Sequence, residues 1–257
     1  MSKTAKETIK SNFSKYAKTY DKHASVQKLA AQKLAVMIPK DGISTVLDIG
    51  CGTGIFTEII KAKFKGSNII AMDISDQMIS VAKQKLGDDK VMFVSGDAEE
   101  IDLPVKFDLI TSNATFQWFR KMDSTLSKYA ALLEKKGSLI FSTFGPLTYH
   151  ELARSIREVL KKNVYISSRN FLSKNELEHL LEKNFKKFKI IEHLIIEKNR
   201  SLKDLLRKIK YTGTQGSGIR EDRYIGKDRM KKIEEIYRSR HKNMEATHHL
   251  FFCEALA

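Results

Sequence analysis

Residues 44–145 alternate short runs of apolar and β-branched side chains with longer stretches in which apolar positions recur at helical spacing. The short runs predict buried strands and the longer stretches predict amphipathic helices, the second of them capped by Ser75. Strands alternating with helices at this spacing are typical of right-handed βαβ units, in which a ligand lies at the carboxyl ends of parallel strands. The predicted strands are 44–50, 68–75, 91–98, 107–113 and 137–145, and the predicted helices are 55–64, 76–86 and 124–135.

The two flanks have a different pattern. Residues 5–38 are predicted to be helical, with Phe13, Tyr16 and Tyr20 along one helical face. The glycine-rich stretch 212–218 predicts a mobile loop, because glycine allows positive φ but favours disorder. The remaining predicted elements are helices over 147–162, 174–184, 202–210 and 227–241 and strands over 188–198 and 247–257.

Composition excludes several classes of protein. Two cysteines, Cys51 and Cys253, are too few for a disulfide framework, and no Cys or His pair has the spacing of zinc ligands. His248 and His249 before Cys253 form only a weak metal pattern, so no metal is predicted. No apolar run approaches the ~20 residues of a membrane helix, and the N-terminus lacks the apolar region of a signal peptide. We therefore expect a cytoplasmic protein without a membrane partner.

The net charge of +15 is unevenly distributed along the 257 residues. Residues 1–40 carry 9 basic and 2 acidic side chains, residues 41–145 carry 12 and 14, and residues 146–257 carry 25 and 15. A basic chain favours an acidic partner, such as nucleic acid, an anionic surface or an acidic protein. Here the excess belongs to the flanks, which is typical of a nearly neutral catalytic core under basic covering elements.

A glycine-rich loop, within VLDIGCGTG, follows the first predicted strand. Its glycines at positions 50, 52 and 54 let the backbone approach a ligand closely and expose amides at the start of the next helix. A nicotinamide fingerprint spaces its glycines as G-x-G-x-x-G. The spacing G-x-G-x-G, with Asp48 two residues before the first glycine, favours instead a ligand with an amino-acid part.

Polar side chains also stand at the ends of the next three predicted strands. Asp73 ends the second, 19 residues after the last glycine of the loop, where a carboxylate can accept both hydroxyls of a ribose. Asp97 with Ala98 follows the third, within reach of an adenine edge, and Asn113 ends the fourth. Because the carboxyl ends of parallel strands meet at one edge, we expect these residues to surround one ligand.

The segments VLDIGCGTG, AMDIS, GDAEEIDLP, FDLITSN and LLEKKGSLIFSTF resemble the successive motifs of class I S-adenosylmethionine-dependent methyltransferases. This resemblance implies a Rossmann-like α/β fold with a mostly parallel seven-stranded sheet, helices on both faces and an inserted helical lid. It implies S-adenosylmethionine as cofactor, with its methionine part at the glycine loop, its ribose at Asp73 and its adenine at Asp97 and Ala98. The cofactor-binding residues that follow from it are Asp48, Gly50, Cys51, Gly52, Thr53, Gly54, Asp73, Ile74, Met78, Asp97, Ala98 and Asn113.

The flanks carry a narrower resemblance. The segments FSKYAKTYDKHA, SNATFQWF, FSTFGPLTYHEL, LKDLLRKIKYTG and THHLFF are similar to parts of malonyl-acyl-carrier-protein O-methyltransferases, which begin pimeloyl synthesis for biotin. The pair Gln117 and Trp118 is shared with trans-aconitate methyltransferases, whereas the last two segments favour the malonyl enzymes. This resemblance implies an acidic acyl carrier protein bearing malonyl as partner. The residues proposed to bind the substrate are Tyr16, Tyr20, Gln117, Trp118 and Arg207.

The chemistry that these resemblances imply requires no general base. A carboxylate nucleophile is already ionised at pH 7, since its unperturbed pKa is about 4, so no catalytic residue is assigned. The carboxylate needs a cationic pocket, and the resemblance places Arg207 there. We expect a single domain over 1–257, with a helical cap over 1–40, a cofactor-binding core over 41–145, lid helices with one core strand over 146–245, and a final strand over 246–257.

Other functions remain open at this stage. A small-molecule carboxyl methyltransferase of the trans-aconitate type is one, and an RNA methyltransferase is another, which the basic charge also suggests. Against RNA, no RNA-binding module is appended, and residues 112–115 read SNAT in place of an Asn/Asp-Pro-Pro-Tyr/Phe motif. A binding protein that has lost catalysis is the third alternative, although the intact glycine loop, Asp73 and Asp97 argue that cofactor binding is retained.

Overall fold

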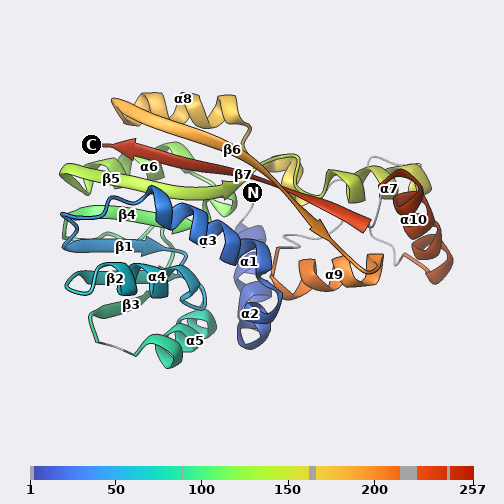
Figure 1. Cartoon of the computed structure of the whole chain (residues 1–257), viewed down its shortest axis with the longest axis horizontal. Coiled ribbons are helices and arrows are strands. Elements are labelled where there is room, and N and C mark those ends of the chain that lie inside the picture. The colour runs from blue at the N-terminus through green and yellow to red at the C-terminus, as the bar shows by residue number, and fades with distance from the viewer. Residues whose placement is uncertain (1–2, 88, 162–165, 215–224, 242–243) are drawn as a thin grey trace.

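The computed structural model describes residues 3–87, 89–161, 166–214, 225–241 and 244–257, arranged around one seven-stranded sheet (Figure 1). The strand order is β3-β2-β1-β4-β5-β7-β6, and β7 runs antiparallel to its neighbours β5 and β6 while the other described pairs are parallel. The strands are β1 (Thr45–Ile49), β2 (Asn68–Asp73), β3 (Val91–Ser95), β4 (Phe107–Asn113), β5 (Leu133–Phe144), β6 (Lys187–Lys198) and β7 (Glu245–Leu256).

The helices cover both faces of this sheet. The α-helices are α1 (Lys3–Tyr16), α2 (Tyr20–His23), α3 (Ser25–Met37), α4 (Ile55–Lys63), α5 (Asp76–Leu86), α6 (Met122–Ala131), α7 (His150–Leu160), α8 (Lys174–Asn184), α9 (Leu202–Tyr211) and α10 (Lys227–Arg240). The part of the chain that the structure describes also contains the short 3-10 helices η1 (Ala17–Thr19), η2 (Phe116–Trp118) and η3 (Ser167–Asn170).

Strand alternation divides the core into two apolar layers, because successive side chains of a strand point to opposite faces. Val46 of β1 lies in the layer with Leu34 of α3 and Ile60 of α4. Its neighbour Leu47 lies in the layer with Leu126 of α6 and Leu177 of α8. The sheet is therefore buried on both faces, which agrees with the near-continuous apolar runs of its parallel strands.

The order of the strands fixes where a ligand can lie. The chain builds β2 and β3 on one side of β1 and then crosses to β4 on the other side, so β1 and β4 flank a topological switch point. In open α/β sheets ligands bind in the crevice outside the carboxyl ends of the strands at such a point. The loop after β1 and the residues that follow β2 and β4 meet there, as the sequence predicts.

A third and smaller apolar cluster lies beyond the sheet. Leu152 of α7, Leu205 of α9 and Ile233 of α10 are buried together, with Met244 and Ala246 at the start of β7. Figure 1 shows α7, α9 and α10 gathered at one end of the long strands β6 and β7, away from β2 and β3. We call these three helices the helical extension, and its role as a lid remains a prediction.

The structure confirms the predicted elements of the central region and shifts some of their ends. Ser75 caps α5 by accepting a hydrogen bond from the Met78 amide at 3.2 Å. The predicted helix over 124–135 ends at Ala131, because Leu133 already pairs with Phe107 of β4. The loop predicted over 212–218 is described only as far as Thr214, and its other residues lie outside the described part of the chain.

The prediction that Phe13, Tyr16 and Tyr20 share one continuous helical face is wrong. The helix breaks at η1, so α1 ends at Tyr16 and α2 begins at Tyr20. Tertiary contacts explain the break, since Tyr16 packs against Tyr211 of α9 while Phe13 and Tyr20 pack near one another, with ring centroids 6.4 Å apart. Among the described residues, no helix has the length and apolar character needed to cross a membrane.

Candidate functional site

A cavity with about 730 Å³ of empty space lies at the carboxyl ends of β1, β2, β3 and β4. We call it the strand-end cavity. Eight of the twelve predicted cofactor-binding residues line it, namely Gly50, Gly52, Asp73, Ile74, Met78, Asp97, Ala98 and Asn113. Lys6, Ile9 and Phe13 of α1 cover it together with Tyr20 of α2. The other four, Asp48, Cys51, Thr53 and Gly54, are not among its lining residues.

The glycines of the loop after β1 have different roles. A Cβ built on Gly50 would lie 2.2 Å from the Thr115 hydroxyl, and one on Gly54 would lie 2.8 Å from the Leu86 side chain. Gly50 and Gly54 are therefore required by packing inside the protein. A Cβ on Gly52, whose φ is +56°, would meet no protein atom within 4 Å. Because Gly52 lines the cavity, its missing side chain leaves room for a ligand.

Asp48 supports the loop from within the sheet, and it is 1% exposed. One carboxylate oxygen accepts a hydrogen bond from the Thr57 hydroxyl at 2.6 Å, while the other has no partner among the described residues. Burial raises the pKa of Asp48 to about 7, although the Thr57 hydrogen bond opposes the shift. Because Asp48 does not line the strand-end cavity, its role in the described structure is to hold the helix after the loop through Thr57 of α4.

Asp73 is held at the end of β2 by two backbone amides. The Gly52 amide donates to one carboxylate oxygen at 2.9 Å, and the Ser75 amide donates to the other at 2.8 Å. Burial raises the pKa of Asp73 to about 6, and these amide hydrogen bonds counteract part of that rise. Each oxygen still has a second acceptor position. The carboxylate is thus fixed at the cavity wall and remains able to accept two ligand hydroxyls.

Asp97 pairs with a lysine that the sequence prediction missed. Lys6 of α1 forms ion pairs with Asp97 and, at 2.5 Å, with Glu99. These contacts tie α1 across the part of the cavity predicted to take adenine. A signal for Lys6 was present in the sequence, because Lys6, Ile9 and Phe13 stand at i, i+3 and i+7 and so share one helical face.

Three further predicted residues act as supports. Thr53 donates a hydrogen bond of 2.5 Å to Asp21 of α2, which also pairs with Lys85 of α5. Cys51 is buried, and burial raises the pKa of its thiol well above the usual value. The Asn113 amide donates to the Gln27 carbonyl at 3.0 Å and accepts from the Ser142 hydroxyl at 2.8 Å. Cys51 is thus a neutral thiol, and Asn113 reaches the cavity in an orientation set by the protein.

A second cavity, which we call the helix-lined cavity, has about 1020 Å³ of empty space and lies against the helical extension. Its walls come from the end of β5, the start of α7, the segment around η3, and α9. The described residues that line it are Trp118, Phe144, Thr148, Tyr149, Leu152, Ile166, Ser167, Ser168, Phe171, Leu206, Ile209, Lys210 and Thr214. Trp118 lines both cavities and so marks where they meet.

Trp118 is held between aromatic rings from both sides of this junction. Its ring meets Phe13 of α1 edge-on at 6.1 Å and Phe171 edge-on at 5.5 Å between centroids. The side chain is 7% exposed, and its indole N–H is buried without a hydrogen-bond acceptor among the described residues. An unsatisfied buried donor costs about 1–3 kcal/mol, so a ligand that offers an acceptor here is favoured.

The structure separates the other predicted substrate residues. Tyr20 lines the strand-end cavity, where burial, with a smaller effect of the Asp73 charge, raises the pKa of its phenol. Tyr16 lines neither cavity, because its ring packs against Tyr211 at 5.0 Å. Gln117 lines neither cavity, since its amide donates to the Ala114 carbonyl at 2.6 Å and accepts from Thr143 at 3.2 Å. Gln117 thereby holds η2 and its neighbour Trp118 in place.

Arg207 is not brought to either cavity. Leu206, Ile209 and Lys210 stand at i, i+3 and i+4 of α9 and share the face that lines the helix-lined cavity. Arg207 lies on an exposed part of the same helix. The sequence therefore indicated the helix that lines the cavity, α9. Among the described residues, however, the α9 cation that lines the cavity is Lys210. The predicted binding of the substrate carboxylate by Arg207 finds no support in this geometry.

Together the switch-point crevice, the glycine loop and the carboxylates after β1, β2 and β3 define a class I methyltransferase. Residues 47–141 match the family model described as "Methyltransferase domain". The chain is 36% identical over 252 residues to malonyl-[acyl-carrier protein] O-methyltransferase 2 of Ilyobacter polytropus, covering 96% of each protein. It is 32% identical over 262 residues to malonyl-[acyl-carrier protein] O-methyltransferase of Halalkalibacterium halodurans, again covering 96% of each. The chain belongs to the malonyl-[acyl-carrier protein] O-methyltransferase family.

Solved structures share the fold. The YcgJ protein of Bacillus subtilis superimposes with a TM-score of 0.62 at 18% identity, over 89% of this chain and 97% of that one. Phosphoethanolamine N-methyltransferase 2 of Haemonchus contortus, solved in complex with S-adenosylmethionine, gives a TM-score of 0.59 at 18% identity, over 94% of this chain and 57% of that one. At these identities the similarity concerns the fold.

S-adenosylmethionine is the cofactor of this class, and the strand-end cavity fits it. Gly52 leaves open space in the wall, and Asp73 offers free acceptor positions and a negative charge at the cavity. These features suit a ligand that carries hydroxyls and positive charge. Asp97 and Ala98 line the cavity at the predicted adenine position, and Lys6 forms an ion pair with the Asp97 carboxylate there.

Proposed function

We propose that this protein transfers a methyl group from S-adenosylmethionine to the free carboxylate of a malonyl group carried by acyl carrier protein. The observation that carries the proposal is similarity to such enzymes along nearly the whole chain, including both flanks of the methyltransferase core. The junction of two cavities at Trp118 supports it, because one cavity suits the cofactor and the other can hold a second substrate. The product is a methyl ester, which the sequence resemblance places early in pimeloyl and biotin synthesis.

The residues of this chain contribute position and exclusion of water rather than proton transfer. When bound, S-adenosylmethionine supplies a methyl group on a positively charged sulfur. The substrate carboxylate is ionised at pH 7 without help, since its unperturbed pKa is about 4. Alignment of two reactants in a closed site is itself a large source of rate. Phe13, Tyr20 and Trp118 form the aromatic part of the wall that excludes water, and the indole N–H of Trp118 is suited to orient a substrate oxygen.

An acidic carrier is the partner that the charge distribution favours. The helical extension carries exposed cations, and Lys210 among them lines the helix-lined cavity to which a carrier has to deliver its acyl group; the exposed cations are Lys203, Arg207, Lys210, Lys231 and Lys232. Complementary charge of this kind accelerates encounter more than it strengthens the final complex. Arg207 fits this docking role better than a role inside the cavity. A cytoplasmic location and the absence of a nucleic-acid partner remain predictions.

Trans-aconitate is a second candidate substrate that the sequence leaves open. Aconitate has three carboxylates, whereas the described residues that line the helix-lined cavity include a single cation, Lys210. Burying several carboxylates without matching cations is strongly unfavourable. The geometry therefore favours an acyl group that carries one carboxylate over a substrate that carries three.

A labelled methyl donor tests the proposal directly. We would supply it with malonyl-acyl carrier protein, malonyl-coenzyme A, trans-aconitate and bulk RNA in parallel reactions. We expect alkali-labile label in the malonyl thioesters, as a methyl ester requires. Label in RNA or trans-aconitate with unlabelled malonyl thioesters would overturn the proposal, and no label in any reaction would favour a protein that binds the cofactor without turnover.

A further inference from the structure

The helix-lined cavity is much larger than the group to be methylated. Its empty space of about 1020 Å³ includes open solvent, and the cavity volume itself is about 290 Å³, close to the lower end of the ~300–1,000 Å³ of pockets that enclose drug-sized ligands. A malonyl group has only three carbons. A malonyl group alone would leave most of this cavity unfilled. We therefore expect another part of the substrate to occupy the rest of the cavity.

The walls indicate the chemistry of that part. Leu152, Leu206 and Ile209 contribute apolar surface from α7 and α9. Thr148 and Ser168 also line the cavity, and because their hydroxyls donate to protein carbonyls they offer acceptor positions to a ligand. None of the described lining residues is an Asp or a Glu. Such a surface suits a long, uncharged chain that has both alkyl and amide groups.

The two ends of the cavity differ in exposure and charge. Trp118 is buried and also lines the strand-end cavity. The group to be methylated therefore has to lie at the Trp118 end of the helix-lined cavity. Lys210 is exposed and is the only lysine or arginine among the described lining residues. A substrate that enters from the surface and ends at Trp118 thus passes a cation at its outer end. An anionic group is favoured at that outer end.

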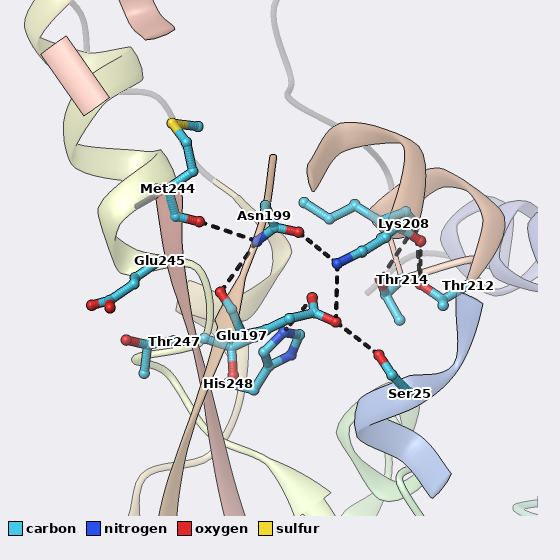
Figure 2. A network of polar contacts seen from close by, with 12 residues as sticks. Ser25, Glu197, Asn199, Lys208, Thr212, Thr214, Met244, Glu245, Thr247 and His248 are labelled. Carbon is cyan, nitrogen blue, oxygen red and sulfur yellow. Dashed lines mark hydrogen bonds and ion pairs between the residues drawn. The ribbon is translucent and has the colours of Figure 1, made fainter. Parts of the chain in front are cut away.

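The wall formed by α9 is held by a polar network rather than by surface contacts alone (Figure 2). Glu197 of β6 accepts a hydrogen bond from Ser25 of α3 at 2.7 Å and pairs with Lys208 of α9 at 3.3 Å and His248 of β7 at 3.4 Å. Lys208 also donates to Asn199 at 2.8 Å. The network therefore ties α9 to β6, α3 and β7, and so holds one wall of the cavity in place.

We propose that the helix-lined cavity binds the pantetheine-type thioester arm that links the acyl group to its carrier. The acyl end lies at Trp118, the alkyl and amide groups lie against α7 and α9, and the phosphate end lies at Lys210. This inference rests on the proposed function and deepens it, because it makes the arm, and not only the malonyl carboxylate, a determinant of substrate choice.

A series of malonyl thioesters of decreasing arm length tests the inference with the unmodified protein. We expect kcat/KM to fall at least about tenfold, or about 1.4 kcal/mol, from malonyl-pantetheine to malonyl-N-acetylcysteamine, which lacks most of the arm. Malonyl-phosphopantetheine should exceed malonyl-pantetheine. Equal kcat/KM across the series would overturn the arm site while leaving the proposed function intact. Failure to methylate any malonyl thioester would instead overturn the proposed function.

Filling the cavity from α9 provides the second test. Ile209→Trp should lower kcat/KM for malonyl-pantetheine by a larger factor than it lowers kcat/KM for malonyl-N-acetylcysteamine, so that the preference for the longer thioester falls at least about fivefold. Leu206→Trp is the companion variant on the same face, and Val36→Trp on the exposed part of α3 is the matched control. Cofactor affinity and the melting temperature report whether each variant is folded. Equal losses for both thioesters in the folded variants would count against the arm site.

Discussion

The strand-end cavity and the helix-lined cavity meet at Trp118 but are built in different ways. In the first, polar groups come from loops after parallel strands and are fixed by short backbone hydrogen bonds, as at Asp73. In the second, walls come mainly from helix faces that pack around their own small apolar cluster. The shape of the strand-end cavity therefore depends on a few backbone positions, whereas the shape of the helix-lined cavity depends on how whole helices pack.

This difference explains how charge is distributed along the chain. The region from 41 to 145 carries 12 basic and 14 acidic side chains, and its acidic groups include the three strand-end carboxylates. The region from 146 to 257 carries 25 basic and 15 acidic side chains and contains the helical extension. A carboxylate-lined site suits a cationic cofactor, while a basic covering suits an acidic carrier.

The largest effect is expected at Gly52. A side chain there would enter the strand-end cavity and would have to adopt a φ of +56°. Gly52→Ala should weaken cofactor binding about a hundredfold while costing about 1 kcal/mol of stability from the left-handed backbone. Calorimetric titration with S-adenosylhomocysteine and denaturant unfolding measure the two effects.

Gly42 is the matched control for that variant. It has a φ of +81°, and a Cβ there would also meet nothing within 4 Å, but it does not line the cavity. Gly42→Ala should lose similar stability and keep full cofactor affinity. Equal loss of affinity in both variants would mean that backbone strain, rather than ligand space, accounts for Gly52.

The sequence predicts the strand-end cavity well because its chemistry follows from strand order. Asp73 and Asp97 stand where parallel strands end, so their meeting follows from the βαβ pattern alone. Lys6 was missed although helical spacing places it with Phe13, because no local rule shows that this face of α1 covers the cavity. Asp48 and Thr53 follow the family motif but support the site from outside its lining.

The helix-lined cavity is less predictable for the same physical reason. The sequence indicates that α9 is an amphipathic helix. Which of its residues line the cavity depends on how α9 packs against α7 and α10. Arg207 and Lys210 are three positions apart, and only the fold shows that Lys210 lines the cavity. The break at η1 that separates Tyr16 from Tyr20 likewise depends on contacts with α9 that lie nearly 200 residues away in sequence.

Glu197→Gln should affect the helix-lined cavity next most strongly. The variant removes the negative charge that pairs with Lys208 and His248, so α9 is held less firmly. We expect a loss of about 2 kcal/mol of unfolding free energy, less than for a fully buried pair, together with a raised KM for the thioester. Cofactor affinity should not change. Loss of cofactor affinity would contradict the separation of the two cavities.

The pH dependence of this variant gives a further check. Burial raises the pKa of Glu197, but hydrogen bonds from His248 and Ser25 and nearby positive charge outweigh it and lower the pKa to about 2. A depressed pKa stabilises the fold above the ordinary value of ~4.3 and loses that effect as the pH falls through about 2. The stability difference between parent and Glu197→Gln should thus be smaller at pH 3 than at pH 7. Glu192→Gln, at a more exposed pair with His249, should show little effect at either pH.

Lys210 and Arg207 distinguish the structure-based assignment from the sequence-based one. The sequence predicts that Arg207→Ala depresses methylation of a malonyl thioester with cofactor binding intact. Because Lys210 lines the cavity and Arg207 does not, we expect Lys210→Ala to raise KM for malonyl-phosphopantetheine about tenfold and Arg207→Ala about twofold. Steady-state kinetics at saturating cofactor measure both. A larger effect at Arg207 would restore it as the cation that binds the substrate.

The smallest expected effect is that of salt concentration on KM. It distinguishes docking of the carrier on the surface from binding of the substrate inside the cavity. Exposed charges on the helical extension act through solvent, where a Debye length of about 8 Å at physiological ionic strength already weakens them. Raising the salt concentration should therefore increase KM for malonyl-acyl carrier protein about threefold while changing KM for uncharged malonyl-pantetheine little. The comparison uses the same enzyme, the same cofactor and the same transferred group, so only the carrier differs. A salt effect of equal size on both substrates would place the responsible charges within the site, and the basic flank would then have no distinct part in recognising the carrier.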